Sequence, residues 1–290
     1  MKLSTVLTAT AFATATHFAQ AANLTLDVYN PGNNSVFPVS SEIISGDKEV
    51  VLIDAQFQNN DAQQLVDKIK KLDKKLTTIY ISHSDPDYYF GLETLTKAFP
   101  DAKVVATQQT VDAINATKDG KLAYWGGVLK NEAPSKVVVP EVIKTNRFTV
   151  DGETLEIKGL DGASPDRSYV WVPSLKAVVG GVVVSDNIHV WVADTQTKQS
   201  RQDWQQTLES IKALKPSVVV PGHFTGKSKM DLASVTFTQK YLTDFEKANS
   251  QSKNSAELIK KMETRYPSLD DKSSLELGAK VVKGEMQWPQ

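Results

Sequence analysis

Side chains that could bind a metal ion lie close together between residues 83 and 87, directly after an apolar segment. That segment, Thr78–Ile81, is rich in β-branched and apolar residues, which predicts a short buried strand. Pro86 fixes its own φ and lacks an N–H, so the chain is expected to turn there. His83, Asp85 and Asp87 occupy alternate positions, and an extended loop directs alternate side chains to the same face. The spacing therefore favours a metal site in which these three residues are candidate ligands.

The motif that contains these residues resembles the signature of the metallo-β-lactamase superfamily, His-x-His-x-Asp-His followed by an apolar residue and a glycine. His83 corresponds to the first histidine and Asp87 to the aspartate. Asp85 and Tyr88 stand where the second and the last histidine belong, so two of the four positions have changed type. The resulting pattern, H-x-D-x-D-Y, is similar to that of a divergent secreted branch of the superfamily.

Two further segments extend the resemblance, which covers residues 24–223. Val50–Asp54 is similar to the early strand that ends in a supporting aspartate, and Val218–His223 is similar to the late strand that carries the last histidine. The resemblance implies an α/β fold, an αββα sandwich with helices outside two sheets. It makes His223 a candidate metal ligand, and Asp54 and Tyr88 candidate pocket residues.

The predicted strands and helices follow an order that agrees with this fold. Strands are expected at residues 24–28, 42–45, 49–53, 78–81, 103–106, 147–150, 154–158, 168–172, 177–180 and 218–220. Helices are expected at residues 62–72, 92–99, 109–115, 204–214, 232–249, 256–265 and 275–283. Residues 119–134 contain aromatic side chains among glycines without a clear period and are predicted to form a loop. Its Leu122, Tyr124, Trp125 and Val128 either line a substrate pocket or pack against the edge of the sheet.

Three segments are expected along the chain. Residues 1–21 have the features of a cleaved signal peptide, because Lys2 precedes a weakly apolar run that ends in Ala19-Gln20-Ala21. The run is too short and too rich in threonine for a membrane anchor, and no later stretch has 18 continuous apolar residues. Residues 22–245 are predicted to form the main domain and residues 246–290 a C-terminal helical extension packed on it. The mature protein is expected in the periplasm or secreted.

The net charge and the amino-acid composition limit the kinds of molecule that the protein is expected to bind. Cleavage removes Lys2 and changes the formal charge from −1 to −2, which is too small to favour nucleic acid or an anionic membrane. A small-molecule substrate is expected, and the sequence assigns no oligomeric state. The chain has no cysteine, so disulfides and thiolate ligands are excluded, and His, Asp and Tyr are the side chains left to bind a metal.

The sequence lacks two further metal ligands that the resemblance implies. The third histidine of the family is expected between residues 159 and 166, where Asp161 and Gly162 stand, and the bridging aspartate at the position of Val182. A normal two-zinc centre is therefore not expected. One reduced site would use His83 and Asp85 with Asp161, and the other Asp87 and His223 with Tyr88. Such sets suit one weakly held Zn²⁺, Mn²⁺ or Fe²⁺, while a cluster of hydrogen-bonded His and Asp residues without an ion is the alternative.

Two functional hypotheses follow. The first is a hydrolase of an ester, lactone or amide, in which a metal-activated water attacks and Asp87 accepts its proton. The second is a non-catalytic protein that binds small molecules and has lost its metal centre. His189 is predicted to be a hydrogen-bonded structural histidine, or else to line the substrate mouth together with Trp191.

Overall fold

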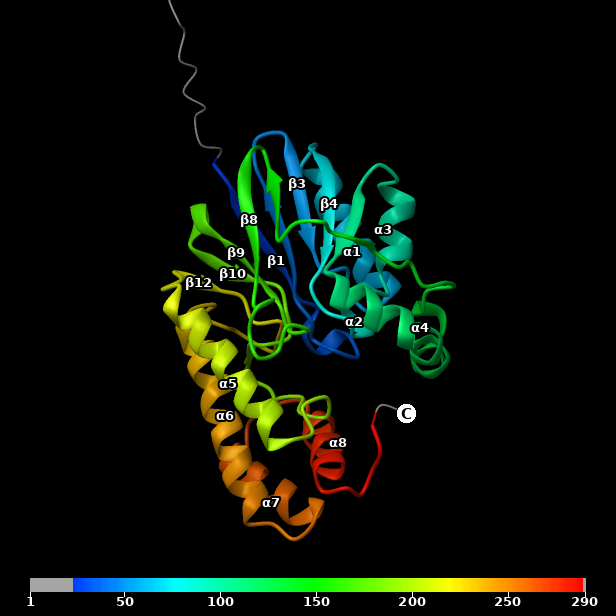
Figure 1. Cartoon of the computed structure of the whole chain (residues 1–290). Helices are drawn as coiled ribbons and strands as arrows, with labels where there is room; N and C mark the ends of the chain where they lie inside the picture. Colours follow the sequence, from blue (N-terminus) through cyan, green and yellow to red (C-terminus); the bar gives the residue numbers. More distant parts are fainter. Residues whose placement is uncertain (1–22, 289–290) are drawn as a thin grey trace, which may run out of the picture.

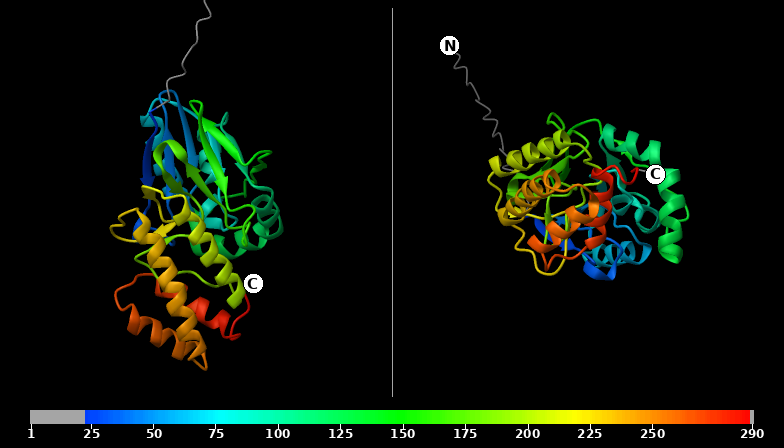
Figure 2. Two further views of the ribbon diagram at one scale, coloured as in Figure 1. Left: turned by 60° about the vertical axis from the view of Figure 1, so that its left-hand side comes forward. Right: turned by 90° about the horizontal axis from the view of Figure 1, so that it is seen from below.

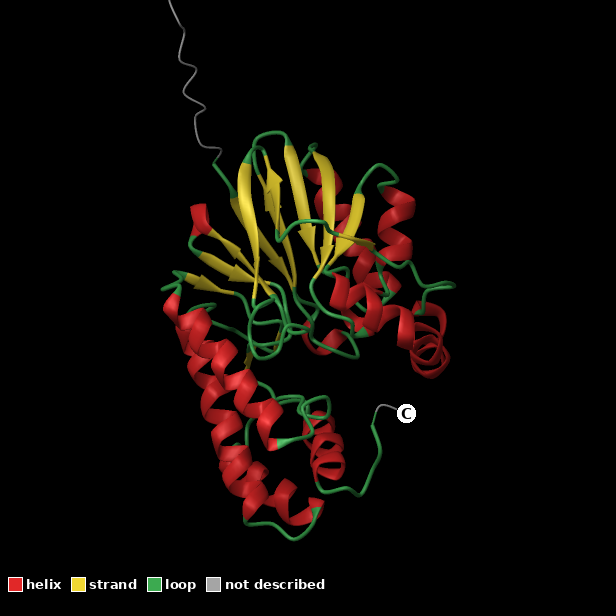
Figure 3. Ribbon diagram, viewed as in Figure 1, coloured by secondary structure: helices red, strands yellow, loops and turns green. Residues whose placement is uncertain are grey.

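The two β-sheets of the protein pack face to face. The computed structural model describes residues 23–288, so the signal peptide expected at residues 1–21 lies outside the described part of the chain. Helices cover the outer faces of the sandwich (Figure 1), and further helices from the C-terminal part lie beyond one end of it (Figure 3). This arrangement confirms the expected αββα sandwich with a C-terminal helical extension.

The first sheet has six strands in sequence order, and the second has five strands in the order β12-β10-β9-β8-β7. The strands of the first sheet are β1 (Thr25–Tyr29), β2 (Ser41–Ser45), β3 (Glu49–Ile53), β4 (Lys75–Ile81), β5 (Lys103–Ala106) and β6 (Glu141–Val142). Those of the second are β7 (Arg147–Val150), β8 (Glu153–Lys158), β9 (Tyr169–Val172), β10 (Ala177–Val179) and β12 (Val218–Val219). A short parallel pair, β11 (Ser185–Asp186) and β13 (His223–Phe224), places Ser185 beside His223.

The helices fall into two groups. On the first sheet lie α1 (Asn59–Lys71), α2 (Pro86–Tyr89), α3 (Leu92–Ala98) and α4 (Gln108–Leu129). The second group comprises α5 (Lys198–Ala213), α6 (Leu232–Ser250), α7 (Ser255–Arg265) and α8 (Lys272–Val282). Short 3₁₀ turns are η1 (Gly32–Asn34), η2 (Lys130–Glu132) and η3 (Pro173–Leu175). No helix among residues 23–288 combines the length and apolar composition needed to cross a bilayer.

Alternation along the central strands explains the layers. In β3, Val50 and Leu52 pack against the helices of the first group, whereas Val51 and Ile53 fill the space between the two sheets. In β4, Tyr80 likewise faces the second sheet. A strand with apolar side chains on both faces has to be covered on both sides, so the first sheet is buried between helices and a second sheet.

The C-terminal helices share a core with the second sheet. Phe245 on α6, Met262 on α7 and Leu275 on α8 belong to one buried cluster with Val178 of β10. The boundary expected between residues 245 and 246 falls inside α6, which continues without a break. Seen from below, the segment that follows α8 lies on the side of the molecule where α4 is found, away from α5 (Figure 2).

Helix α4 differs from the sequence prediction, which ended the helix at residue 115 and made residues 119–134 a loop. The structure continues the helix to Leu129 and adds η2. A Cβ added at Gly120, Gly126 or Gly127 would meet no neighbouring atom, so packing does not require these glycines and they only weaken the intrinsic propensity of the helix. Trp125 compensates by packing its ring 5.3 Å from Phe37 and 5.5 Å from Phe57, between ring centres.

The segment that returns from α4 is fastened to α3 by Glu93. Its Oε2 accepts a hydrogen bond from the backbone N–H of Ser135 (2.6 Å), and its Oε1 accepts from the Ser135 hydroxyl (2.6 Å) and from Lys97 Nζ (2.8 Å). Burial disfavours the charged form of Glu93, but these hydrogen bonds outweigh burial and lower its pKa from 4.5 to about 2.

Replacing Glu93 with Gln should therefore lower the free energy of unfolding at pH 7 by about 2 kcal/mol, because hydrogen bonds to a charged group are lost. The folded-state pKa is depressed, so this contribution is present above pH 4.5 and disappears as the pH falls toward 2. Urea unfolding should show that the free energies of unfolding of the variant and of the unmutated protein approach each other as the pH is lowered from 7 to 3. The exposed Glu141, changed to Gln, serves as the control. A difference between Glu93→Gln and the unmutated protein that stayed constant with pH would contradict this account.

Candidate functional site

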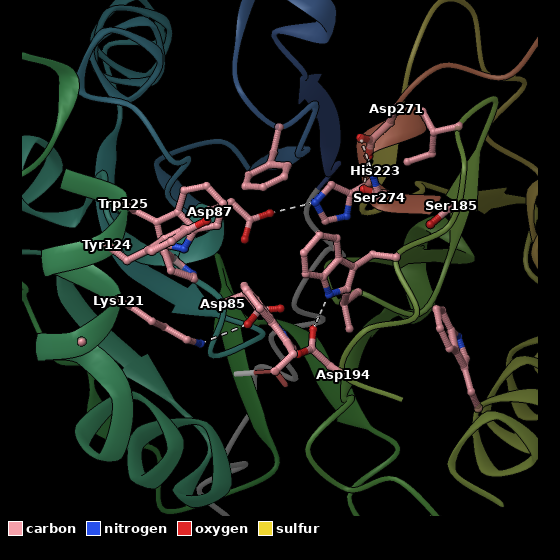
Figure 4. Close-up of a pocket in the computed structure, with 18 residues that line it drawn as sticks. Asp85, Asp87, Lys121, Tyr124, Trp125, Ser185, Asp194, His223, Asp271 and Ser274 are labelled. Atoms are coloured by element: carbon pink, nitrogen blue, oxygen red, sulfur yellow. Dashed lines mark hydrogen bonds and ion pairs between the residues drawn. The ribbon is translucent and has the colours of Figure 1, made fainter. Parts of the chain in front are cut away.

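A cavity lies between the end of the sandwich and the C-terminal helices (Figure 4), with an empty volume of about 920 Å³ that includes space open to solvent. Its walls come from segments that are far apart in the sequence. The lining residues are Phe37, Asp85, Pro86, Asp87, Gly120, Lys121, Tyr124, Trp125, Val182, Ser185, Ile188, Trp191, Asp194, Trp204, His223, Asp271, Ser274 and Trp288. Aromatic and carboxylate side chains therefore dominate the surface that a ligand would meet.

Asp54 supports the floor of this site without lining it. It follows β3 with a positive φ of 62° and is fully buried. Its Oδ1 accepts a hydrogen bond from Ser82 N (2.8 Å) and its Oδ2 accepts from the Ser82 hydroxyl (2.6 Å). The same hydroxyl accepts a bond from Gly181 N (2.8 Å), so the ends of three strands are tied together. Burial raises the pKa of Asp54 to about 7, although the bonds from Ser82 oppose that rise.

Asp87 and His223 form the first of two ionic pairs. His223 Nε2 lies 2.8 Å from Asp87 Oδ2, and His223 Nδ1 lies 3.3 Å from the hydroxyl oxygen of Tyr88. Asp87 sits in the first turn of α2, whereas His223 begins β13. Burial alone would lower the pKa of His223, but the hydrogen bond and the charge of Asp87 outweigh it and raise that pKa. Asp87 therefore favours the protonated form of His223.

The second pair centres on Asp85. Its Oδ1 accepts from Lys121 Nζ (3.1 Å), and its Oδ2 lies 3.3 Å from His83 Nδ1. Lys121, which projects from α4, also donates to the carbonyl of Ser84 (2.9 Å). Burial opposes the charge on Asp85, yet the positive charges and hydrogen bonds of His83 and Lys121 prevail and hold its pKa well below the ordinary value. An ammonium group of the protein itself therefore neutralises this carboxylate.

The expected metal ligands meet in one region but do not surround a common point. Tyr88 is fully buried, and its ring centre lies 5.5 Å from that of His83 and 5.7 Å from that of His223. Both histidines meet this ring edge to face, at interplanar angles of 66° and 81°. Among residues 23–288, no three His, Cys, Asp or Glu side chains are arranged to hold an ion. Because the donors are divided into two pairs, each satisfied by a cationic side chain, they do not fit a metal centre.

Two residues proposed for the pocket lie elsewhere. His189 is fully buried, and its Nδ1 lies 3.0 Å from the Tyr241 hydroxyl on α6, so it faces the C-terminal core. Burial lowers its pKa. Asp161 is exposed in the turn after β8, which a bond from Gly162 N to the Gly159 carbonyl closes. Neither side chain lines the cavity, although Ile188 and Trp191, which flank His189 in the sequence, do.

Other lining residues were not found from the sequence. Because residues 119–134 were predicted to form a loop, Lys121 was not a candidate. In the structure it lies on α4 four residues before Trp125, and residues four apart lie on the same side of a helix. Trp288 lies far from every motif and reaches the cavity through the fold of the C-terminal helices. There, Trp191 and Trp288 donate their indole N–H groups to the two oxygens of Asp194. Trp191, an alternative candidate for the mouth, does line the cavity.

Comparison with known proteins gives consistent matches. The family model of the metallo-beta-lactamase superfamily matches residues 34–223. Metallo-beta-lactamase type 2 from Bacteroides fragilis is 28% identical over 192 residues, 64% of this chain and 69% of that protein. An uncharacterized protein, YobT from Bacillus subtilis (strain 168), is 26% identical over 126 residues, 42% of this chain and half of its own length.

Solved structures show the same fold. A metallo-beta-lactamase from Pontibacter korlensis superposes with a TM-score of 0.53 at 21% identity, covering 76% of this chain and 93% of its own. The metallo-beta-lactamase IND-7 gives a TM-score of 0.54 at 22% identity, covering 77% of this chain and all of its own. The family match ends at His223, so helices α6–α8 and Trp288 lie outside it.

Proposed function

Because the chain belongs to the metallo-beta-lactamase superfamily, we propose that it is a hydrolase of a small ester, lactone or amide in which Asp87 is the general base. The observation that carries this proposal is the orientation of Asp87 at the cavity wall. His223 holds its Oδ2 at 2.8 Å, and within residues 23–288 its Oδ1 has no hydrogen-bond partner. That second oxygen is free to accept a proton from a water in the cavity.

Lys121 supplies the second catalytic element. An ammonium group has three N–H donors, and two of them are used by the Ser84 carbonyl and by Asp85. The third is free to donate to the oxygen of a substrate carbonyl, where negative charge develops as water attacks. A single donor of this kind contributes about 10²- to 10³-fold in rate. Asp85 acts as a positioning residue, because it fixes the ammonium group beside the cavity.

Asp87 and Lys121 together account for the proton transfers and for the negative charge that develops in the reaction. The water oxygen forms a bond to the carbonyl carbon while Asp87 takes one of its protons, and the carbonyl oxygen becomes an oxyanion beside Lys121. When the tetrahedral intermediate collapses, the bond to the leaving oxygen or nitrogen breaks and Asp87 returns its proton to that atom. His223 keeps Asp87 oriented and balances its charge. Metal-activated water is not part of this proposal, because the donor atoms are divided between two ionic pairs.

We place this activity in the periplasm or outside the cell. The features that support export are the apolar run after Lys2 and the small residues Ala19 and Ala21. N-terminal sequencing of the secreted protein, with Ala22 or Asn23 as the first residue, tests this assignment. An intact Met1 on the secreted protein would overturn it.

The function is tested with metal-depleted protein and a panel of chromogenic aryl esters, lactones and anilides. We expect turnover in the presence of a chelator, and no increase when Zn²⁺, Mn²⁺ or Fe²⁺ is added. Lys121→Met should lower kcat by about 10²-fold, since the oxyanion loses its donor. The control Lys118→Met changes the same helix one turn earlier, at a residue that does not line the cavity. Turnover that requires an added metal would overturn the mechanism, and binding without any turnover would favour the non-catalytic hypothesis.

A further inference from the structure

Two carboxylates of the cavity have no cationic partner. Asp85 is paired with Lys121, and Asp87 with His223. Asp194 and Asp271 take part in no ion pair among residues 23–288. Asp194 accepts hydrogen bonds from two indole N–H groups, which are neutral donors that orient a carboxylate but leave its charge uncompensated. Asp271 caps α8, where it accepts from Ser273, Ser274 and the backbone.

Aromatic side chains line the cavity together with these two carboxylates, and two of them contact Asp194. Trp191 and Trp288 meet edge to face with ring centres 5.4 Å apart, and Phe37 bridges Trp191 (6.3 Å) and Trp125 (5.3 Å). Tyr124 is 52% exposed and meets Trp125 at 4.9 Å. Figure 4 shows Tyr124 and Trp125 on the wall that α4 forms, with Asp194 and Asp271 on segments across the cavity. Aromatic rings attract cations through their faces, and six aromatic side chains are part of the cavity lining.

The positive charge of Arg167 acts on Asp194 from outside the cavity lining. Arg167 is buried, with its guanidinium carbon 4.7 Å from the ring centre of Trp204, and it is not part of the cavity lining. Burial and the charge of Asp85 together raise the pKa of Asp194 despite the opposing effect of Arg167. An anionic ligand would meet Asp194 and Asp271 as like charges, whereas a cation would find two carboxylates and the faces of several aromatic rings.

We infer that the cavity binds an organic cation, a quaternary or protonated amine with an apolar body, through Asp194, Asp271 and the aromatic wall. The inference rests on the proposed function in one respect, since it makes such a cation the part of the substrate that lies next to the scissile ester or amide. Cation–π attraction together with a carboxylate is the physical basis of quaternary ammonium recognition in aromatic cages. The cation would lie beside Asp194 and against Trp191 and Trp288, while the carbonyl reaches toward Lys121 and Asp87.

The test uses three ligands of nearly the same shape that differ in charge. Choline is cationic, 3,3-dimethylbutan-1-ol is neutral and 3,3-dimethylbutanoate is anionic. Binding is followed through the fluorescence of the tryptophans in the cavity and by calorimetry. We expect choline to bind at least about 10-fold more tightly than the neutral alcohol, and the anion to bind most weakly. The preference should shrink as ionic strength rises.

Asp194→Asn is the decisive variant, because it removes the charge at nearly constant size and keeps one oxygen that can accept from one of the two indole N–H groups. It should reduce the preference for choline over the alcohol by about 5- to 10-fold. Asp61→Asn is the control, since Asp61 is a buried carboxylate on α1 outside the cavity. Equal binding of the alcohol and choline, tighter binding of the anion, binding of none of the three, or an unchanged preference in Asp194→Asn would overturn the inference. None of these ligands has a scissile bond, so failure here is distinct from failure of the hydrolase assay.

Discussion

Replacing Asp87 with Asn should reduce kcat by about 10²- to 10⁴-fold, which is the usual contribution of a general base. The change removes the carboxylate that accepts the proton. The amide oxygen of the new side chain can still accept a hydrogen bond from His223 Nε2, which lies 2.8 Å from Oδ2 of Asp87 in the unmutated protein. KM should change much less than kcat, because the base acts in the transition state and not in substrate binding. Steady-state kinetics on the best substrate of the chromogenic panel measure both constants.

A matched change elsewhere separates catalysis from stability. Asp61→Asn alters another buried carboxylate, one that accepts from the Tyr29 hydroxyl at 2.9 Å and does not line the cavity. It should leave kcat within about a factor of two, because surface and supporting residues outside a site have no role in the transition state. Thermal unfolding of both variants confirms that each is folded. An Asp87→Asn protein that kept more than about a tenth of the activity would remove Asp87 from the role of base.

The sequence was sufficient for most of the strands and for part of the place where the site residues meet. Runs such as residues 49–53 and 103–106 have the β-branched composition of buried strands, and β3 and β5 have these bounds. The two-residue strands β6, β11 and β13 were not predicted, because two residues are too few to show a pattern. Asp54 and His83 follow the ends of the adjacent parallel strands β3 and β4, which lie at one edge of the first sheet. His223 instead begins β13 and is positioned by the pairing of β13 with β11.

The parts that were not predicted depend on tertiary contacts. The C-terminal half of α4 has glycines that argue against a helix, and the contacts of Trp125 with Phe37 and Phe57 override them. Lys121 could not be placed beside Asp85 before the course of that helix was known. Trp288 reaches the cavity because α6, α7 and α8 place the last described residues at the end of the sandwich, and no local pattern around Trp288 indicates this.

The division of the donors into two pairs was beyond sequence reasoning for a different reason. The candidate ligands were identified by type and spacing, and these do not determine which atoms face each other. The orientation comes from Tyr88, whose ring lies against both histidines, and from Lys121, whose ammonium neutralises Asp85. Asp85 and Tyr88, which stand where the family motif has histidines, and Lys121 on α4 therefore keep the candidate metal ligands in two separate pairs.

This explanation predicts that the ion-binding capacity can be restored. The triple variant Asp85→His, Tyr88→His and Val182→Asp replaces the phenol, adds a second histidine in the loop and supplies an aspartate at the position of the family's bridging ligand. Val182 lines the same cavity as Asp87 and His223, so its replacement would face them. After dialysis against zinc and then against buffer, we expect about one equivalent of zinc by elemental analysis, bound by Asp87, His223 and the two new side chains at 88 and 182.

The same variant should show a strong effect of zinc on stability. Loss of the fully buried Tyr88 ring destabilises the ion-free protein by about 3 kcal/mol, and zinc at 100 times its dissociation constant restores about 2.7 kcal/mol. Thermal unfolding with and without zinc measures the difference, which should be absent in the unmutated protein. Adding His223→Ala to the triple variant should abolish both zinc binding and zinc stabilisation, because an essential nitrogen ligand is lost. If the triple variant holds no more zinc than the unmutated protein, Tyr88 and Asp85 are not what keeps the donors apart.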